Sequence, residues 1–222
     1  MELMFVLVAF LIVSLAQLIL RSTYAKYKKI EVNSKLKGRE VAAAILREYD
    51  LTDIRIAEIS GELTDNFNNS RRLISLSDDI YEGNTIASCA VAAHECGHAI
   101  QYKEGYVPIK IRNMLVPFVN IGNSLGYIVI VISLATSATK LFLIGLALIS
   151  LALLFQLVTL PCEFDASRRA NKILLEMGLV TEEEHDGTKA MLKAAAFTYV
   201  AGLFSSILQI LRIVYIFTND RD

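Results

Sequence analysis

Histidine and cysteine are both scarce in this sequence, with three residues of each among 222. Charge of either sign is balanced, because 22 basic and 23 acidic residues leave a formal net charge of −1. No stretch combines basic with aromatic residues into a patch, so we do not expect nucleic-acid binding. Internal repeats and low-complexity segments are also lacking. A chain of this length suffices for one substantial domain, or for one domain with membrane segments.

Long apolar runs, in contrast, are abundant. Apolar residues make up 54% of the chain and the mean hydropathy is +0.46, which is too apolar for an ordinary soluble protein. Runs of the length needed to cross a bilayer lie at residues 3–20, 114–135, 141–160 and 194–217. The last is weaker because it contains Gln209 and Arg212. The first lacks a basic leader and a clear cleavage site, so we expect an uncleaved anchor rather than a signal peptide.

Basic residues near the ends of these runs predict the orientation of the chain. They follow the first run, precede the second and follow the third, whereas the link between the second and third carries only Lys140. Because basic residues favour the cytoplasmic side, we expect the N-terminus outside and the polar regions in the cytoplasm. Cys89, Cys96 and Cys162 then lie in a reducing compartment, where an odd number of thiols argues against a disulfide framework.

The polar region after the first run predicts a small α+β unit. In chain order we expect a helix at 37–49, a strand at 54–59, a loop at 61–70, a strand at 72–77, a turn at 78–84 and a helix at 84–101. The helices follow from apolar residues at helical spacing, and the strands from alternating ones. Asn84 or Thr85 is the expected N-cap of the last helix.

The most informative motif lies in that last helix, where His94-Glu95-Cys96-Gly97-His98 is an H-E-x-x-H sequence. Residues four apart lie on one face of a helix, so His94 and His98 can bind the same ion. Glu95 lies beside them and can take a proton from a water at the metal. This pattern is typical of zinc hydrolases, and we expect one zinc per chain with Glu95 as the catalytic base.

A catalytic zinc usually has three protein ligands and one open position for water. The candidates for the third ligand are Cys162, Glu163, Asp165 and His185. His185 lies among acidic residues and is expected to be solvated. We favour Glu163, because a carboxylate with two histidines is a known catalytic zinc set. It is also expected to begin a helix, 163–177, after a break at Pro161.

The second and third apolar runs are expected to form a membrane hairpin that returns the chain to the side of the motif helix. Gly178 is expected to end helix 163–177, and Thr181 with Glu184 to begin another. Polar residues also lie inside the hairpin, namely Asn120, Asn123 and Gln156. They either hydrogen-bond between its helices, which we favour, or line a cavity.

These motifs resemble a known group of peptidases. The H-E-x-x-H motif, followed downstream by Glu163-Phe164-Asp165-Ala166-Ser167, is similar to the gluzincin pattern of membrane peptidases related to HtpX and the CAAX prenyl protease. More closely, nearly the whole chain resembles the YugP-type neutral zinc metallopeptidases of bacterial membranes, through residues 90–101, 161–170 and 198–201.

The resemblance implies peptidase activity and Glu163 as the third zinc ligand. The HtpX pattern has an aspartate where Ser167 stands here. That aspartate would orient a histidine ligand, so the role falls to Ser167 or Asp165, or is absent.

We therefore predict a mainly α integral membrane protein with a small α+β zincin-like catalytic unit and about 3–4 transmembrane helices. The expected parts are an N-terminal anchor at 1–21, a cytoplasmic catalytic part at 22–112, a transmembrane hairpin at 113–160, cytoplasmic helices with the third ligand at 161–193, and a C-terminal apolar helix at 194–222.

The predicted function is a membrane-embedded zinc endopeptidase with its site on the cytoplasmic side. Its partners are the lipid bilayer and a protein or peptide substrate. Strand 72–77 is expected to hold an extended peptide by strand addition at residues 73–76. The alternative is a membrane scaffold that binds zinc without catalysis.

Overall fold

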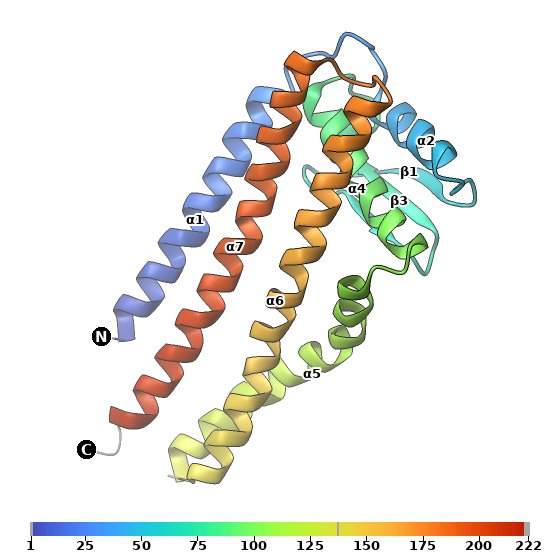
Figure 1. Cartoon of the computed structure of the whole chain (residues 1–222). Coiled ribbons are helices and arrows are strands. Elements are labelled where there is room, and N and C mark those ends of the chain that lie inside the picture. Colours follow the sequence, from blue (N-terminus) through green and yellow to red (C-terminus); the bar gives the residue numbers. More distant parts are fainter. Residues whose placement is uncertain (1, 137, 220–222) are drawn as a thin grey trace. The chain divides into compact units, whose positions relative to one another are not determined.

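The computed structural model describes residues 2–136 and 138–219, and these residues are mainly helical (Figure 1). The helices are α1 Glu2–Tyr27, α2 Gly38–Glu48, α3 Asp78–Tyr81, α4 Ile86–Lys103, α5 Val107–Thr136, α6 Thr139–Glu176 and α7 Glu182–Asn219. The strands are β1 Arg55–Ile59, β2 Asn66–Asn68 and β3 Leu73–Ser77. They build two compact units. The apolar unit comprises Met1–Gln17, Val107–Pro161 and Thr198–Asp222, and the α/β unit comprises Leu18–Tyr106 and Cys162–Phe197.

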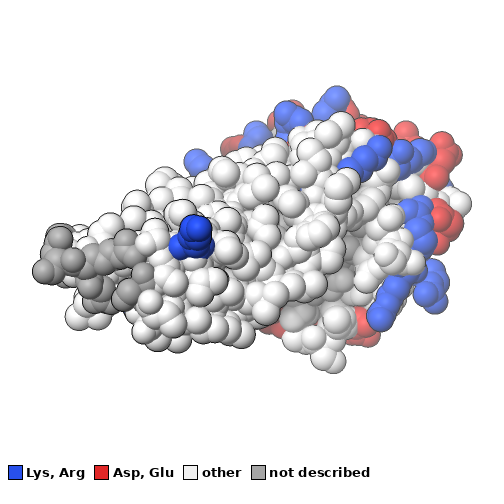
Figure 2. Space-filling model, turned by 90° about the horizontal axis from the view of Figure 1, so that it is seen from below, with Lys and Arg blue, Asp and Glu red and all other residues white. Residues whose placement is uncertain are grey.

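Four of the helices, α1, α5, α6 and α7, are long and apolar enough to cross a membrane. Many of their large apolar side chains are exposed, among them Leu3, Phe10, Met114, Ile121 and Val131. Figure 2 shows a broad surface of uncharged residues in which a single basic side chain stands alone. Apolar surface of this extent indicates contact with lipid rather than water. The chain is thus a mainly helical membrane protein with a small α+β unit, as predicted.

Helices α5 and α6 pack as a hairpin in the apolar unit, and glycines let their backbones approach. A Cβ added to Gly126 would lie 3.2 Å from the Gly145 carbonyl oxygen. Small residues commonly allow such close packing in membranes. Asn123, inside this hairpin, lines a cavity of about 380 Å³ together with side chains of α6 and α7. For Asn123, therefore, the cavity interpretation is favoured over a hydrogen bond between the hairpin helices.

Helix α6 runs through Pro161, so the predicted break at that residue is wrong. A proline inside a helix costs about 3 kcal/mol, because it lacks an N–H donor and crowds the preceding turn. The residues that follow offset this cost. Cys162, Ala166, Ala170 and Leu174 lie four apart on one face of the helix and are fully buried. Packing of this face in the α/β unit keeps α6 continuous to its end.

The last helix is longer than predicted, although its start is as expected. Gly178, with a φ of +64°, follows the end of α6. Thr181 and Glu184 then form a reciprocal cap. The Thr181 N–H donates to Glu184 Oε2 over 2.8 Å, and the Glu184 N–H donates to Thr181 Oγ1 over 3.3 Å. From this cap α7 continues to Asn219, so the expected cytoplasmic helix and the fourth apolar run are one element.

The α/β unit contains a three-stranded sheet in the order β1-β3-β2. β1 pairs with β3 in parallel, with Ile56 opposite Ile74, and β2 pairs with β3 antiparallel, with Phe67 opposite Ile74. The two predicted strands are confirmed, whereas β2 lies in the region predicted as a loop. Three residues are too few to show the alternation of apolar and polar residues that predicts a strand. Asn66 and Asn68 are also polar residues typical of loops. The predicted turn after β3 contains the one-turn helix α3.

Helix α4 is the central element of the α/β unit and is buried along most of its length. It begins at Thr85, one of the two predicted caps, whose side-chain oxygen accepts a hydrogen bond from the Ser88 N–H. At Gly97 it meets α6. A Cβ added there would lie 2.7 Å from the Ala166 carbonyl oxygen and 3.2 Å from the Ala166 Cα. The two helix backbones are therefore in direct contact at this point.

We expect Gly97→Ala to lower the free energy of unfolding by about 1–3 kcal/mol, because the added methyl group overlaps a backbone atom that cannot move alone. Thermal unfolding of the detergent-purified protein would measure this change. Gly202→Ala in α7 is the matched control, since its methyl group would meet no atom closer than 3.6 Å. Equal stability of the two variants would contradict the backbone contact.

Candidate metal centre

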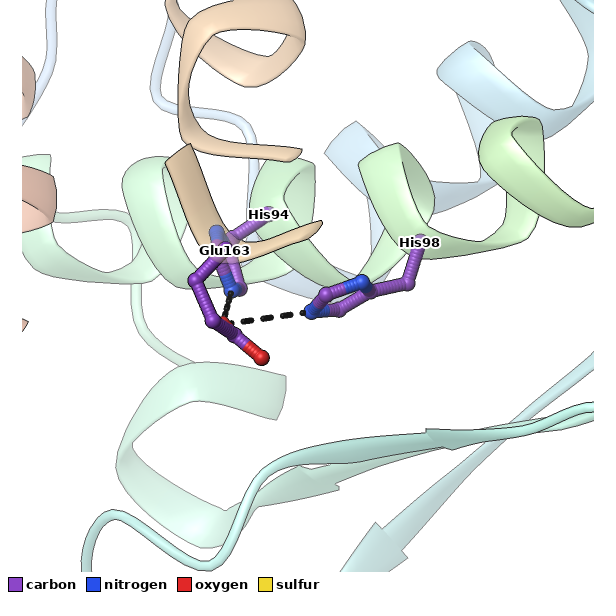
Figure 3. Close-up of side chains that lie close together, drawn as sticks. All are labelled: His94, His98 and Glu163. Atoms are coloured by element: carbon purple, nitrogen blue, oxygen red, sulfur yellow. Dashed lines mark ion pairs between the residues drawn. The ribbon is translucent and has the colours of Figure 1, made fainter. Parts of the chain in front are cut away.

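Helix α4 presents both histidines of the H-E-x-x-H motif on one face. His94 and His98 are one turn apart, with ring centroids separated by 4.7 Å and ring planes at 82°. Their side chains are largely buried, at 14% and 11% exposure. In Figure 3 both rings direct a nitrogen toward Glu163.

Glu163 of α6 completes a group of three possible ligands. Its Oε2 lies 3.3 Å from His94 Nε2 and 3.5 Å from His98 Nε2 (Figure 3). One ligand atom from each residue lies within 4.8 Å of the others. The structure thus brings together the three residues expected at the metal. Glu163 lies inside α6, however, and not at the start of a helix as predicted.

The three ligand atoms have the chemistry that zinc requires, and the two distances to Glu163 have the matching length. Two imidazole nitrogens and one carboxylate oxygen are a known catalytic set. Ligands about 2.1 Å from an ion in tetrahedral geometry lie about 3.4 Å from one another. The distances of 3.3 Å and 3.5 Å agree with this value. Glu163 Oε2 is also buried and, within the described part of the chain, has no hydrogen-bond partner. Such an oxygen is costly to bury unless a cation binds it, so the residues fit a zinc ion.

Glu95 lies next to this group and is only 7% exposed. Burial raises the pKa of its carboxyl group above the ordinary value, while positive charge on His94 and His98 acts in the opposite direction. A carboxylate with a raised pKa takes up a proton closer to neutral pH, which suits a general base. Burial lowers the pKa of His98, but the neighbouring Glu163 carboxylate outweighs burial, so the pKa of His98 is raised.

Each histidine also has a contact at its second ring nitrogen. Ser167 Oγ lies 3.3 Å from His94 Nδ1. Among the described residues, Asp165 reaches His98 only through Gln101. Gln101 Nε2 donates to Asp165 Oδ2 over 2.9 Å, and Gln101 Oε1 lies 3.0 Å from His98 Nδ1. Contacts of this kind fix the orientation of a ligating ring and raise its basicity.

Gln101 is the side chain at this centre that the sequence-based predictions lack. It is fully buried although it is polar. A signal for it exists in the sequence, because residues 94, 98 and 101 share one face of a helix. An uncharged polar residue on the same face as two predicted ligands is a candidate for a supporting contact.

The other candidates for the third ligand lie outside the group. Cys162 is fully buried, and its backbone carbonyl accepts a hydrogen bond from Gln101 Nε2 over 2.8 Å. His185 is only 6% exposed, so the expectation that it is solvated is wrong. The first turns of α7 pack into the α/β unit, which also buries the neighbouring Glu184 and Thr188.

The predicted strand addition at residues 73–76 is also wrong, because β3 is not an edge strand. β1 and β2 flank it, and its side chains Ile74 and Leu76 are fully buried. β2 is the edge strand on one side of the sheet. Its Phe67 ring lies 5.6 Å from the Tyr102 ring of α4, measured between centroids. The sheet edge beside the motif helix is therefore that of β2.

Comparison with known proteins decides the family. The profile of the family described as "Putative neutral zinc metallopeptidase" matches residues 2–218. The chain belongs to this family. A curated relative, "Putative membrane protease YugP" of Bacillus subtilis (strain 168), is 38% identical over 207 residues, which cover 93% of this chain and 92% of the relative. No solved structure matches the chain. The family agrees with the resemblance found in the motifs.

Purified protein is expected to contain about one zinc per chain, and His98→Ala and Glu163→Ala are expected to lose it. Each substitution removes one of three ligand atoms, and elemental analysis of the detergent-purified variants measures the loss. His185→Ala is the matched control, since His185 lies outside the group and should not affect zinc content. Zinc retained in Glu163→Ala, or lost in His185→Ala, would contradict this ligand set.

Proposed function

We propose that this protein is a membrane-embedded endopeptidase that hydrolyses peptide bonds with zinc held by His94, His98 and Glu163 and with Glu95 as the catalytic base. One observation carries the proposal. Glu163 Oε2 of α6 lies within 3.5 Å of the Nε2 atom of each motif histidine in α4. Three ligands of this kind leave one position open for water, as catalytic zinc sites do. Membership of a zinc metallopeptidase family supports the same chemistry.

A zinc ion in this site supplies Lewis-acid chemistry, because it lowers the pKa of water and polarises the scissile carbonyl. The residues of the chain do the rest. Glu95 accepts a proton from the attacking water and delivers it to the leaving amine. Its burial supports this role, because burial raises the pKa of the carboxyl group and brings proton uptake and release closer to neutral pH.

The free edge of β2 offers a place for the substrate. β2 pairs with β3 on one side only, and its Phe67 lies near Tyr102 of the motif helix. An extended peptide can add to such an edge through main-chain hydrogen bonds, which bind it with little dependence on its sequence. We infer that the substrates are extended or unfolded segments of proteins near the bilayer.

The metal centre is proposed to face the cytoplasm. If all four candidate spans cross the membrane, the two ends of the described chain lie on the same side. The basic residues that flank the spans favour the cytoplasm for the segments between α1 and α5 and between the apolar runs of α6 and α7. Both ends of the chain then lie outside, and His94, His98 and Glu163 lie at the cytoplasmic face.

Glu95→Gln is expected to keep zinc and to lower turnover by about 10²–10⁴-fold, because the amide cannot accept the proton. Zinc content and cleavage of a fluorescence-quenched unfolded protein are measured on the same preparation. Glu48→Gln, at an exposed position in α2, is the control and should change neither quantity. Unaltered turnover in zinc-loaded Glu95→Gln would refute the assignment of the base. Zinc without cleavage in the wild type would favour the scaffold alternative.

Single introduced cysteines can test the sidedness, because the three natural cysteines are buried. A membrane-impermeant maleimide should label Lys140→Cys from the outside of right-side-out vesicles. It should label Glu183→Cys only after the membrane is opened with detergent. Both positions are exposed, so accessibility in the folded protein is not limiting. The reverse labelling pattern would place the metal centre outside the cell.

A further inference from the structure

The side-chain amide of Gln101 has only one workable orientation. Its Nε2 lies 2.8 Å from the Cys162 carbonyl oxygen and 2.9 Å from Asp165 Oδ2. A carbonyl oxygen can only accept, so the amide group that faces Cys162 is the NH₂ group. The opposite orientation would set the amide oxygen against two other oxygens with no proton between them. Gln101 is fully buried, so no bulk water relieves that repulsion.

Asp165 is an acceptor in this network, because two arginines hold it in its charged form. Arg169 Nε donates to Asp165 Oδ2 over 2.6 Å, and Arg168 donates to Asp165 Oδ1. Arginine keeps its charge in proteins, and an ionised carboxylate has no proton to donate. Arg169 is itself held by Glu104, over 2.6 Å between Nη1 and Oε2. Both hydrogens of the Gln101 amide are thus directed at groups that only accept.

The orientation of the amide determines which nitrogen of His98 carries the proton. Gln101 Oε1 lies 3.0 Å from His98 Nδ1, and an amide oxygen can only accept. Nδ1 must therefore be the donor. In the neutral ring Nε2 then has no proton, and its lone pair faces Glu163 Oε2 at 3.5 Å, so in the metal-free chain the Gln101 contact must outweigh the repulsion between these two acceptors. This is the form of imidazole that binds a metal through Nε2.

His94 is under no such constraint. Its Nδ1 lies 3.3 Å from Ser167 Oγ, and a hydroxyl group can donate or accept. Both neutral forms of His94 are compatible with that contact. The two histidines of the motif therefore differ in how firmly their protonation pattern is fixed.

We propose that Gln101 is a positioning residue that holds His98 in the Nδ1–H tautomer, with Asp165 and the Cys162 carbonyl fixing the amide. The inference rests on the proposed zinc site, because the Nδ1–H tautomer is useful only if the lone pair of His98 Nε2 is to bind a metal. No tautomer change then accompanies zinc binding at His98.

Two substitutions separate this role from ordinary structural support. Gln101→Leu and Gln101→Glu both disturb the hydrogen bonds to Cys162 and Asp165, but only glutamate keeps an oxygen facing His98 Nδ1. Thr188→Val is the matched control. It removes a fully buried hydroxyl group of the same unit, whose hydrogen-bond acceptors are Asn171 Oδ1 at 3.0 Å and the His185 carbonyl oxygen at 2.9 Å rather than the proposed zinc ligands.

Tautomers are measured by nitrogen NMR of metal-free, ¹⁵N-histidine-labelled protein, at a pH raised until the ¹⁵N shifts show that the His98 ring is neutral. The chain has only three histidines, so single substitutions assign the signals. We expect the Nδ1–H form of His98 in the wild type and in Gln101→Glu. In Gln101→Leu we expect a shift toward the Nε2–H form, which predominates in free histidine.

Zinc affinity, from competition with a chelator, is the second readout. Gln101→Leu should bind zinc about 10–100-fold more weakly, and Thr188→Val should be unchanged. His98 in the Nε2–H form in the wild type, or the same tautomer in Gln101→Leu as in the wild type, would overturn the proposal. If Gln101→Leu does not fold, the wild type and Gln101→Glu still decide, since the Nε2–H form in either overturns it. A wild type that binds no zinc would refute the proposed function, whereas the tautomer of His98 would still test this inference.

Discussion

The metal centre depends on one contact between two helix backbones, at Gly97 of α4 and Ala166 of α6. A Cβ added to Gly97 would lie 2.7 Å from the Ala166 carbonyl oxygen, so the contact leaves no room for a side chain at Gly97. Gly97 lies within one turn of both histidines, and Ala166 lies three residues from Glu163 on the same side of α6. The separation of the backbones therefore sets the distance between the carboxylate and the imidazoles. Because the residues at this contact are small, they bury little apolar area. The close approach of the backbones adds dispersion contacts, which offset the smaller hydrophobic contribution.

Local spacing was enough to predict the parts of this centre that lie on one element. The four-residue spacing of the motif predicts that His94 and His98 converge. Patterns of similar length also predict the Thr85 cap and the strands β1 and β3 elsewhere in the same unit. Apart from Glu163, which is one of few possible ligands in the sequence, the contacts with distant partners were not predicted. Gln101 acts through residues 61 and 64 positions away. The continuity of α6 through Pro161 depends on a buried face that only the folded α/β unit provides. The short strand β2 exists because β3 offers it an edge, and its own three residues carry no strand signal.

Two buried carboxylates, Glu95 and Glu163, share one small space in the α/β unit, with exposures of 7% and 2%. Like charges removed from water destabilise a fold unless positive charge compensates them. The histidines compensate only as imidazolium cations, whereas the neutral Nδ1–H form that leaves His98 Nε2 free for a metal adds no positive charge. Electrostatic stability and readiness to bind are therefore in conflict in the metal-free chain. A divalent cation resolves the conflict, so its binding stabilises the fold as well as completing the site.

The contribution of Cys162 to this network comes from its main chain. Its carbonyl oxygen, with two lone pairs, can serve both the helix and the Gln101 amide. Any residue that keeps α6 helical at this position presents the same oxygen at the same place. The fixed end of the network is therefore encoded by helix geometry rather than by residue identity. Position 162 could therefore vary among related proteins while the hydrogen bond to Gln101 is kept. In a comparison of side chains, only the glutamine would indicate that the network is present.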